Sequence, residues 1–173
     1  KHMLRVIVSG AVIWVWAAAD TPIDGYAIQS AMRNLPSVRM TFGSGGKGID
    51  GFRRAHVDAL TAQRVLGRMR SSARAVSFDQ LRLASLMSRD PEACQRYIAH
   101  VLGDLAHATP VLRQTLRRFL ECSCNATEAA QQLHTHRNTF LRRLEKAEAL
   151  LPRPLANQWI QVAAALDYLQ WSE

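Results

Sequence analysis

Residues 125–144 have the sequence Asn-Ala-Thr-Glu-Ala-Ala-Gln-Gln-Leu-His-Thr-His-Arg-Asn-Thr-Phe-Leu-Arg-Arg-Leu, and this stretch decides the fold of the C-terminal half. Asn125 and Glu128 resemble a capping box, in which the cap side chain accepts from the third amide and the acid returns to the cap amide. They predict a short helix over residues 126–133. Helical periodicity stops at His134-Thr135 and resumes at His136. The sequence therefore predicts a helix-turn-helix unit, in which a turn of about three residues joins two helices.

The second helix has one apolar face and one polar face. We expect Thr135 to cap it. At about 100° per residue, the apolar face consists of Phe140, Leu144, Ala147 and Leu151, with Leu141 at its edge. The polar face consists of Thr135, Asn138, Thr139, Arg142 and Lys146. Arg137 falls near the packed side, but a side chain in the first turn can extend past the helix end.

The polar face is rich in groups that recognise DNA. Arg and Asn pair bidentately with guanine and adenine edges in the major groove, and the remaining cations suit phosphates. Residues 137–146 carry four cations and one acid, Glu145. A basic helix alone is usually a solvated surface helix. The short capped helix before it favours the other interpretation, a recognition helix that enters the major groove.

The helix-turn-helix unit follows Leu112-Arg-Gln-Thr-Leu-Arg-Arg-Phe-Leu120, and together these segments resemble the C-terminal domain of bacterial regulators of the PucR and CdaR type. The resemblance implies a Fis-like helix-turn-helix whose recognition helix opens with His-Arg-Asn-Thr, present here at residues 136–139. It implies that Arg137 reaches a base edge and that Thr139 and Arg142 contact the backbone or neighbouring bases. The predicted DNA-binding residues are Thr135, His136, Arg137, Asn138, Thr139, Arg142, Arg143 and Lys146.

The N-terminal half has the pattern of a mixed α+β fold. Two β-branched and aromatic runs, residues 4–8 and 11–18, flank Ser9-Gly10 and predict a hairpin. The pattern then predicts a helix from Asp20 or Thr21 to about Asn34, a strand Val38–Phe42, a helix from about Phe52 to Met69, and a strand at residues 75–78. We expect these strands to form a small antiparallel sheet with helices on one face. From Leu81 onward the pattern is helical, with helix starts at Asp90-Pro91 and Thr109-Pro110.

This half resembles a degenerate GGDEF-like domain through its hairpin, Thr41-Phe-Gly-Ser-Gly45 and Gly51-Phe-Arg-Arg-Ala-His-Val-Asp-Ala59. Active diguanylate cyclases place acidic metal ligands in the hairpin turn, whereas this chain has Ser9-Gly10-Ala11 there and no acid before Asp20. Joining two nucleoside triphosphates requires divalent metal to neutralise phosphate charge. We therefore expect no enzyme activity and no catalytic, cofactor-binding or metal-binding residues. A nucleotide-binding module derived from this fold is the alternative.

The glycine-rich run at residues 43–48 fits the Gly-x-Gly-x-x-Gly pattern of dinucleotide binding. However, Arg68, Met69 and Arg70 stand where a ribose-binding acid belongs. The run also differs from a phosphate-binding loop, because Gly48 follows Lys47 where Ser or Thr would bind magnesium. We expect a flexible connection.

Composition bounds the partners and the compartment. The chain has 22 Lys and Arg against 14 Asp and Glu, a net charge of +8, which suits a polyanionic partner. Cys94, Cys122 and Cys124 are odd in number, and the last two are too close for an easy disulfide, which predicts free thiols in a reducing cytoplasm. No apolar run reaches the roughly 18 residues of a membrane span. Because Lys1-His2-Met3 resembles a cloning remnant, we expect a sensory region upstream.

The expected organisation is a GGDEF-like α+β domain at residues 4–80, a helical connector at 81–108, and an all-α helix-turn-helix domain at 109–173. The expected partners are double-stranded DNA, further copies of the chain in a homodimer or higher oligomer, and a small-molecule effector bound by the upstream region. Two DNA-binding hypotheses stay open. One is a sequence-specific transcriptional regulator, and the other is an architectural binder with little sequence preference.

Overall fold

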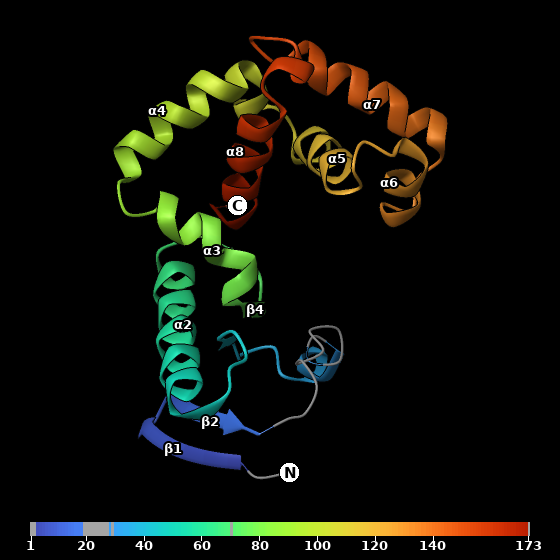
Figure 1. Cartoon of the computed structure of the whole chain (residues 1–173). Helices are drawn as coiled ribbons and strands as arrows, with labels where there is room; N and C mark the ends of the chain where they lie inside the picture. Colours follow the sequence, from blue (N-terminus) through green and yellow to red (C-terminus); the bar gives the residue numbers. More distant parts are fainter. Residues whose placement is uncertain (1–2, 19–27, 29, 70, 173) are drawn as a thin grey trace.

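The computed structural model describes residues 3–18, 28, 30–69 and 71–172, and its C-terminal half is entirely helical (Figure 1). The elements of the N-terminal half are β1 (Met3–Ser9), β2 (Val12–Ala17), η1 (Met32–Asn34), β3 (Met40–Phe42), α2 (Gly48–Arg68) and β4 (Ala75–Ser77). The elements that follow are α3 (Phe78–Met87), α4 (Pro91–Leu102), η2 (Gly103–His107), α5 (Pro110–Glu121), α6 (Ala126–Gln132), α7 (Arg137–Ala149), η3 (Leu155–Asn157) and α8 (Trp159–Ser172). This confirms the predicted order of an α+β half followed by an all-α half.

The predicted hairpin is present. Strands β1 and β2 pair antiparallel, and the Ser9 hydroxyl accepts from the Ala11 amide at 3.2 Å in the turn. Trp14 and Trp16 lie two residues apart on β2, so both side chains point toward α2. The Trp14 ring lies 4.5 Å from the His56 ring, and the Trp16 ring stacks on Phe52 at 5.0 Å between centroids. The period of two along β2 thus anchors the hairpin to the helix.

The prediction of one antiparallel sheet is wrong. The hairpin forms a two-stranded sheet of its own, and β3 pairs with β4 in a second sheet that is parallel, with Thr41 opposite Val76. The physical reason is the connection between these two strands. The chain runs from β3 through α2 into β4, and a helical crossover returns the chain in the same direction.

The glycine-rich run is a site of close backbone packing, in place of the flexible connection that we expected. A Cβ atom on Gly46 would lie 2.5 Å from the Gly51 Cα, and one on Gly43 would lie 1.9 Å from the Ala55 carbonyl oxygen. Only glycine permits such approaches. Helix α2 begins within this run, at Gly48, four residues before the predicted start at Phe52. Most of the predicted helix from Asp20 or Thr21 to about Asn34 lies outside the described residues. Within it, residues 28, 30 and 31 are helical, and Met32–Asn34 form a 3-10 helix.

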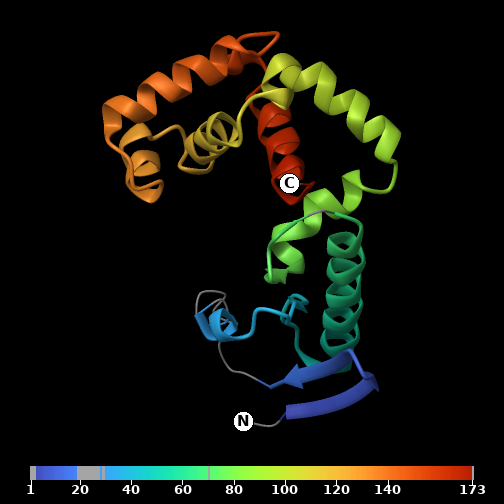
Figure 2. The same ribbon diagram turned by 180° about the vertical axis from the view of Figure 1, so that it is seen from behind.

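Two hydrophobic cores lie at the two ends of α8. The larger core contains Phe140, Leu116, Leu105 and Leu166, and it packs α4, η2, α5, α6, α7 and α8 together. The smaller core lies among α2, β4, α3 and the last turn of α8, where Trp171 is buried. In both views α8 runs between α4 and the group α5–α7, and its C-terminal end reaches α3 (Figures 1 and 2). Helix α8 therefore contributes to both cores.

The predicted division into residues 4–80, 81–108 and 109–173 stays a prediction. Its first boundary falls within α3, whose N-cap Ser77 forms a capping box with Gln80. The predicted helix start at Asp90-Pro91 is confirmed, because the Asp90 side chain accepts from the Ala93 amide at 2.9 Å. No helix in the described ranges is both long and apolar enough to cross a membrane.

Candidate DNA-binding surface

Helix α6 begins as the sequence predicts. Helix α5 ends in a Schellman motif, in which Ser123 and Cys124 have positive φ and the Cys124 amide donates to the Phe119 carbonyl at 2.9 Å. Asn125 then caps α6, because its Oδ1 accepts from the amides of Thr127 and Glu128 at 3.1 and 3.2 Å. The expected return contact of a capping box is replaced, since the Glu128 Oε1 accepts from the Gln132 side chain at 3.3 Å.

The turn between α6 and α7 is also fixed by backbone hydrogen bonds. His134 has φ 48°, its amide donates to the Gln131 carbonyl, and the Thr135 amide donates to the Ala130 carbonyl, both at 3.0 Å. This is a second Schellman motif. The prediction that Thr135 caps α7 is wrong by one residue, because the Schellman motif that ends α6 extends through Thr135 and α7 begins at Arg137. The N-cap is His136, and its carbonyl accepts from the Phe140 amide at 3.0 Å.

The predicted apolar face of α7 is confirmed. Phe140 and Ala147 are fully buried, Leu144 is 7% exposed, and Leu141 and Leu151 are partly buried. The Phe140 ring lies 6.5 Å from the Phe119 ring of α5. Helix α5 packs against both α6 and α7, so the three helices form one tri-helical unit (Figure 1). The unit holds α7 by one face and leaves the opposite face free.

The predicted DNA-binding residues lie together at the start and along the outer face of α7. Those that are exposed are His136, Arg137, Asn138, Thr139, Arg142 and Lys146, and those that are partly buried are Thr135 and Arg143. The exposure of Arg137 resolves its ambiguous position on the helical wheel. The structure thus places Thr135 and His136 in the turn and the other six predicted residues on the first three turns of α7.

The cations of α7 have no ion-pair partner in the part of the chain that the structure describes. Among the described residues, the ion pairs lie on α3, α4 and α5, where Arg82, Arg96, Arg117 and Arg118 meet acids one helical turn away. In the same ranges, no side chain of the eight predicted residues forms a hydrogen bond or ion pair. Arg137, Arg142, Arg143 and Lys146 are therefore available to an external anion.

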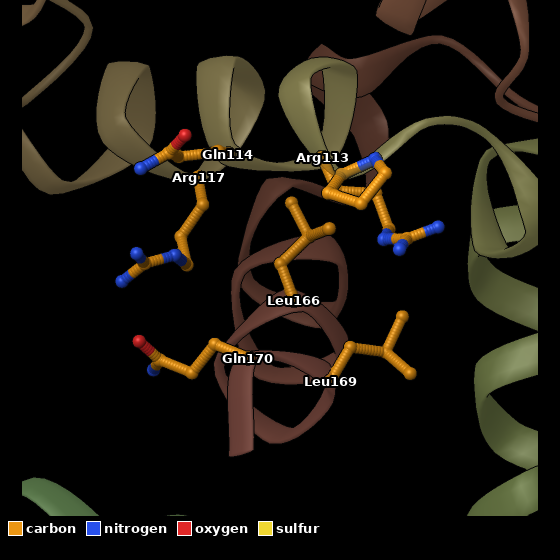
Figure 3. Close-up of a pocket in the computed structure, with 7 residues that line it drawn as sticks. Arg113, Gln114, Arg117, Leu166, Leu169 and Gln170 are labelled. Atoms are coloured by element: carbon orange, nitrogen blue, oxygen red, sulfur yellow. The ribbon is translucent and has the colours of Figure 1, made fainter. Parts of the chain in front are cut away.

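A shallow hollow of about 250 Å³ lies apart from this surface, between α5 and α8 (Figure 3). It is lined by Pro110, Arg113, Gln114, Arg117, Leu166, Leu169 and Gln170. Both arginines bond to the protein itself. Arg113 donates to the carbonyls of Ala106 and Ala108, and Arg117 pairs with Glu121. Arg113 thus joins α5 to the segment that precedes it, whereas the Arg117 pair lies within α5.

Sequence reasoning missed Arg118. In the structure its side chain is 29% exposed and reaches α6. A pattern within one helix carries no signal for this contact, because the contact depends on how α5 and α6 cross. The pairing of Arg118 with Glu121 at i+3 is the only part that periodicity could have suggested.

Comparison with known proteins agrees with this geometry. Residues 112–168 match the model of the PucR C-terminal helix-turn-helix domain. A stretch of 44 residues is 48% identical to part of the purine catabolism regulatory protein of Bacillus subtilis (strain 168). This stretch makes up 25% of this chain and 8% of that protein. The chain therefore spans only a small part of this relative. The C-terminal segment is a PucR-type DNA-binding helix-turn-helix domain.

Proposed function

We propose that the chain is part of a transcriptional regulator that reads double-stranded DNA by inserting α7 into the major groove. One observation carries this proposal: α7 is locked into the core by Phe140 and Ala147, while the rest of its surface presents four cations without an intramolecular partner among the described residues. A helix merely solvated at the surface has no need of the preceding α6 and its fixed turn. A helix that enters a groove needs both.

Each residue of the surface has a proposed role. Arg137 and Asn138 lie in the first turn of α7 and contact base edges, where their side chains match guanine and adenine. Thr139 and Arg142 contact the adjacent backbone or neighbouring bases. The cations Arg143 and Lys146 contact phosphates, and Thr135 and His136 in the turn lie beside them.

The proposal extends to the organisation of the regulator. We propose that the N-terminal half is a degenerate GGDEF-like domain without enzyme activity, and that a region upstream binds a small-molecule effector. Functional binding is dimeric or higher, because one short recognition helix covers few base pairs and two-fold regulators read paired half-sites. Such a regulator acts in the cytoplasm. An architectural binder is the second candidate, favoured only by the cations, which contact any sequence.

Selection of random duplex DNA by the purified chain tests this function. The enriched duplex and a scrambled duplex are then compared by fluorescence anisotropy at one fixed salt concentration. We expect the enriched duplex to bind more tightly, by on the order of 10³ for a specific site. Equal binding of both duplexes would establish the architectural alternative, and no binding of either would refute DNA recognition. Arg53→Ala, which removes an exposed cation of α2, is the control for charge alone.

A further inference from the structure

Helix α6 has little apolar surface with which to fix its orientation. It contains seven residues, of which Ala129 and Ala130 are buried and Ala126 is partly buried, and the partly buried Leu133 follows at its C-cap. Because hydrophobic stabilisation scales with the apolar area removed from water, three alanines and one partly buried leucine contribute little. The Asn125 cap fixes where α6 begins but not its angle to α5. The orientation of α6 therefore depends on other contacts.

Arg118 of α5 supplies such a contact. Its Nη1 atom lies 2.8 Å from the Glu121 Oε2 and donates to the Gln132 Oε1 of α6 at 3.1 Å. The Gln132 amide in turn donates to Glu128 one turn earlier on α6. The guanidinium is thus held by an acid on its own helix while it binds the last turn of α6. That turn leads directly into His134 and the turn before α7.

We propose that Arg118 is a positioning residue for DNA recognition. By joining Glu121 to Gln132 it fixes the angle between α5 and α6, and through the α6–α7 turn it sets where the first turn of α7 meets the groove. The inference rests on the function proposed above. Arg118 itself lies on α5 and contacts no base. Its loss displaces the reading helix and leaves the cations of α7 unchanged.

Arg117 is a matched control on the same helix. It pairs with the same acid, at 2.6 Å from the Glu121 Oε1, and forms no hydrogen bond or ion pair with α6 among the described residues. Arg118→Met and Arg117→Met remove the same charge and retain an apolar stem. Arg118→Lys restores the charge with a single donor group, and Gln132→Met removes the acceptor on α6.

Two measurements test the proposal. Hydrogen exchange of the free protein should be faster across residues 126–133 in Arg118→Met and Gln132→Met, and unchanged there in Arg117→Met. The affinity of Arg118→Met for the selected duplex should fall by about tenfold, a value typical of one lost hydrogen bond to a charged group. Its affinity for scrambled DNA should equal that of Arg117→Met. Arg118→Lys should recover part of the loss.

Three outcomes would overturn the role of Arg118. The first is unchanged exchange across α6 in Arg118→Met, which is measured without DNA and does not depend on the proposed function. The second is equal affinity of Arg118→Met and Arg117→Met for the selected duplex. The third is a salt slope lower by about one for Arg118→Met than for Arg117→Met, which would identify a direct phosphate contact. Absence of any sequence preference in the unaltered protein would instead refute the proposed function.

Discussion

Phe119 and Phe140 meet between α5 and α7, with ring centroids 6.5 Å apart and planes tilted by 51°. Phe140 is fully buried, and Asn138 and Arg142, two residues before and after it and therefore on the opposite side of α7, are exposed. The aromatic pair therefore holds one side of α7 in the core, and the other side is the one proposed to read DNA. Stability and DNA affinity can be changed independently on the two sides.

Phe140→Ala tests the holding side. Removal of a fully buried phenyl ring leaves a cavity against Phe119, which typically costs about 3–5 kcal/mol in the free energy of unfolding. Chemical denaturation monitored by circular dichroism measures this loss. Trp159→Ala, at a residue that is 54% exposed, is the control and should change stability little. An unchanged unfolding midpoint for Phe140→Ala would contradict the packing of α7.

Arg137→Ala tests the reading side. If Arg137 binds a guanine edge, its loss should cost about 1–3 kcal/mol on the preferred duplex and relax discrimination at one base position. The melting temperature should stay unchanged, because the side chain is exposed. Affinities for duplexes that differ at single base pairs provide the measurement. A uniform loss across all of these duplexes would instead make Arg137 a phosphate contact.

Lys146→Ala should behave differently from Arg137→Ala. As a proposed phosphate contact, Lys146 contributes equally to every sequence, and its loss should reduce the slope of log affinity against log salt by about one. Titrations at several salt concentrations measure this slope. Arg53→Ala on α2 removes the same charge far along the chain from α7 and should leave the slope unchanged. Equal slopes for Lys146→Ala and the unaltered protein would remove Lys146 from the interface.

Trp171→Ala tests the link between the two halves. Trp171 is 9% exposed in the smaller core, whereas Val162 and Leu166 of the same helix lie in the larger core. Its removal should cost about 3–5 kcal/mol in the smaller core and leave the larger one packed. Calorimetry should then show the smaller core melting before the larger one. A single transition shifted as a whole would show that the two cores unfold together without this indole.

Asp167→Asn tests the raised pKa of a partly buried carboxyl group on α8. Burial raises the pKa of Asp167, against an opposing effect of Arg117 and with a further rise from Glu121. Between the ordinary carboxyl pKa of roughly 3.9 and the raised value, the folded chain holds a proton that the unfolded chain releases. Stability due to this group therefore falls as pH rises through that window.

The asparagine variant should lack this fall and be more stable than the unaltered protein above the window. Its Oδ1 can still accept from the Gln170 side chain, which donates to Asp167 at 2.7 Å. Melting temperatures from acid to neutral pH provide the measurement. Parallel pH profiles for the two proteins would show that Asp167 keeps an ordinary pKa.

Local signals explain what the sequence predicted well. The Asn125 cap, the break at His134 and the apolar spacing from Phe140 to Ala147 each lie within a few residues, so their consequences could be worked out without a fold. The cap of α7 was misplaced by one residue, because its position depends on how the preceding helix α6 ends. The Schellman motif at the end of α6 extends through Thr135, and the length of that motif is known only once both helices are built.

Nonlocal contacts explain what the sequence did not predict. Parallel pairing of Thr41 with Val76 depends on the path of the chain through α2. Gly46 and Gly51 allow two backbone segments to approach each other closely. Composition alone suggested a flexible loop for the glycine-rich run. The contact from Arg118 to Gln132 joins residues on separate helices. Each of these required the spatial arrangement of elements that the pattern had identified individually.

Amide chemical shifts of the nitrogen-15-labelled protein, followed during titration with the selected duplex, test most directly whether α7 reads DNA. The account predicts that shift changes and intensity losses concentrate at residues 135–146, with α2 and the glycine-rich run at residues 43–48 unaffected. Changes centred on α2 or that run, with α7 unperturbed, would contradict the account and place the DNA elsewhere on the molecule.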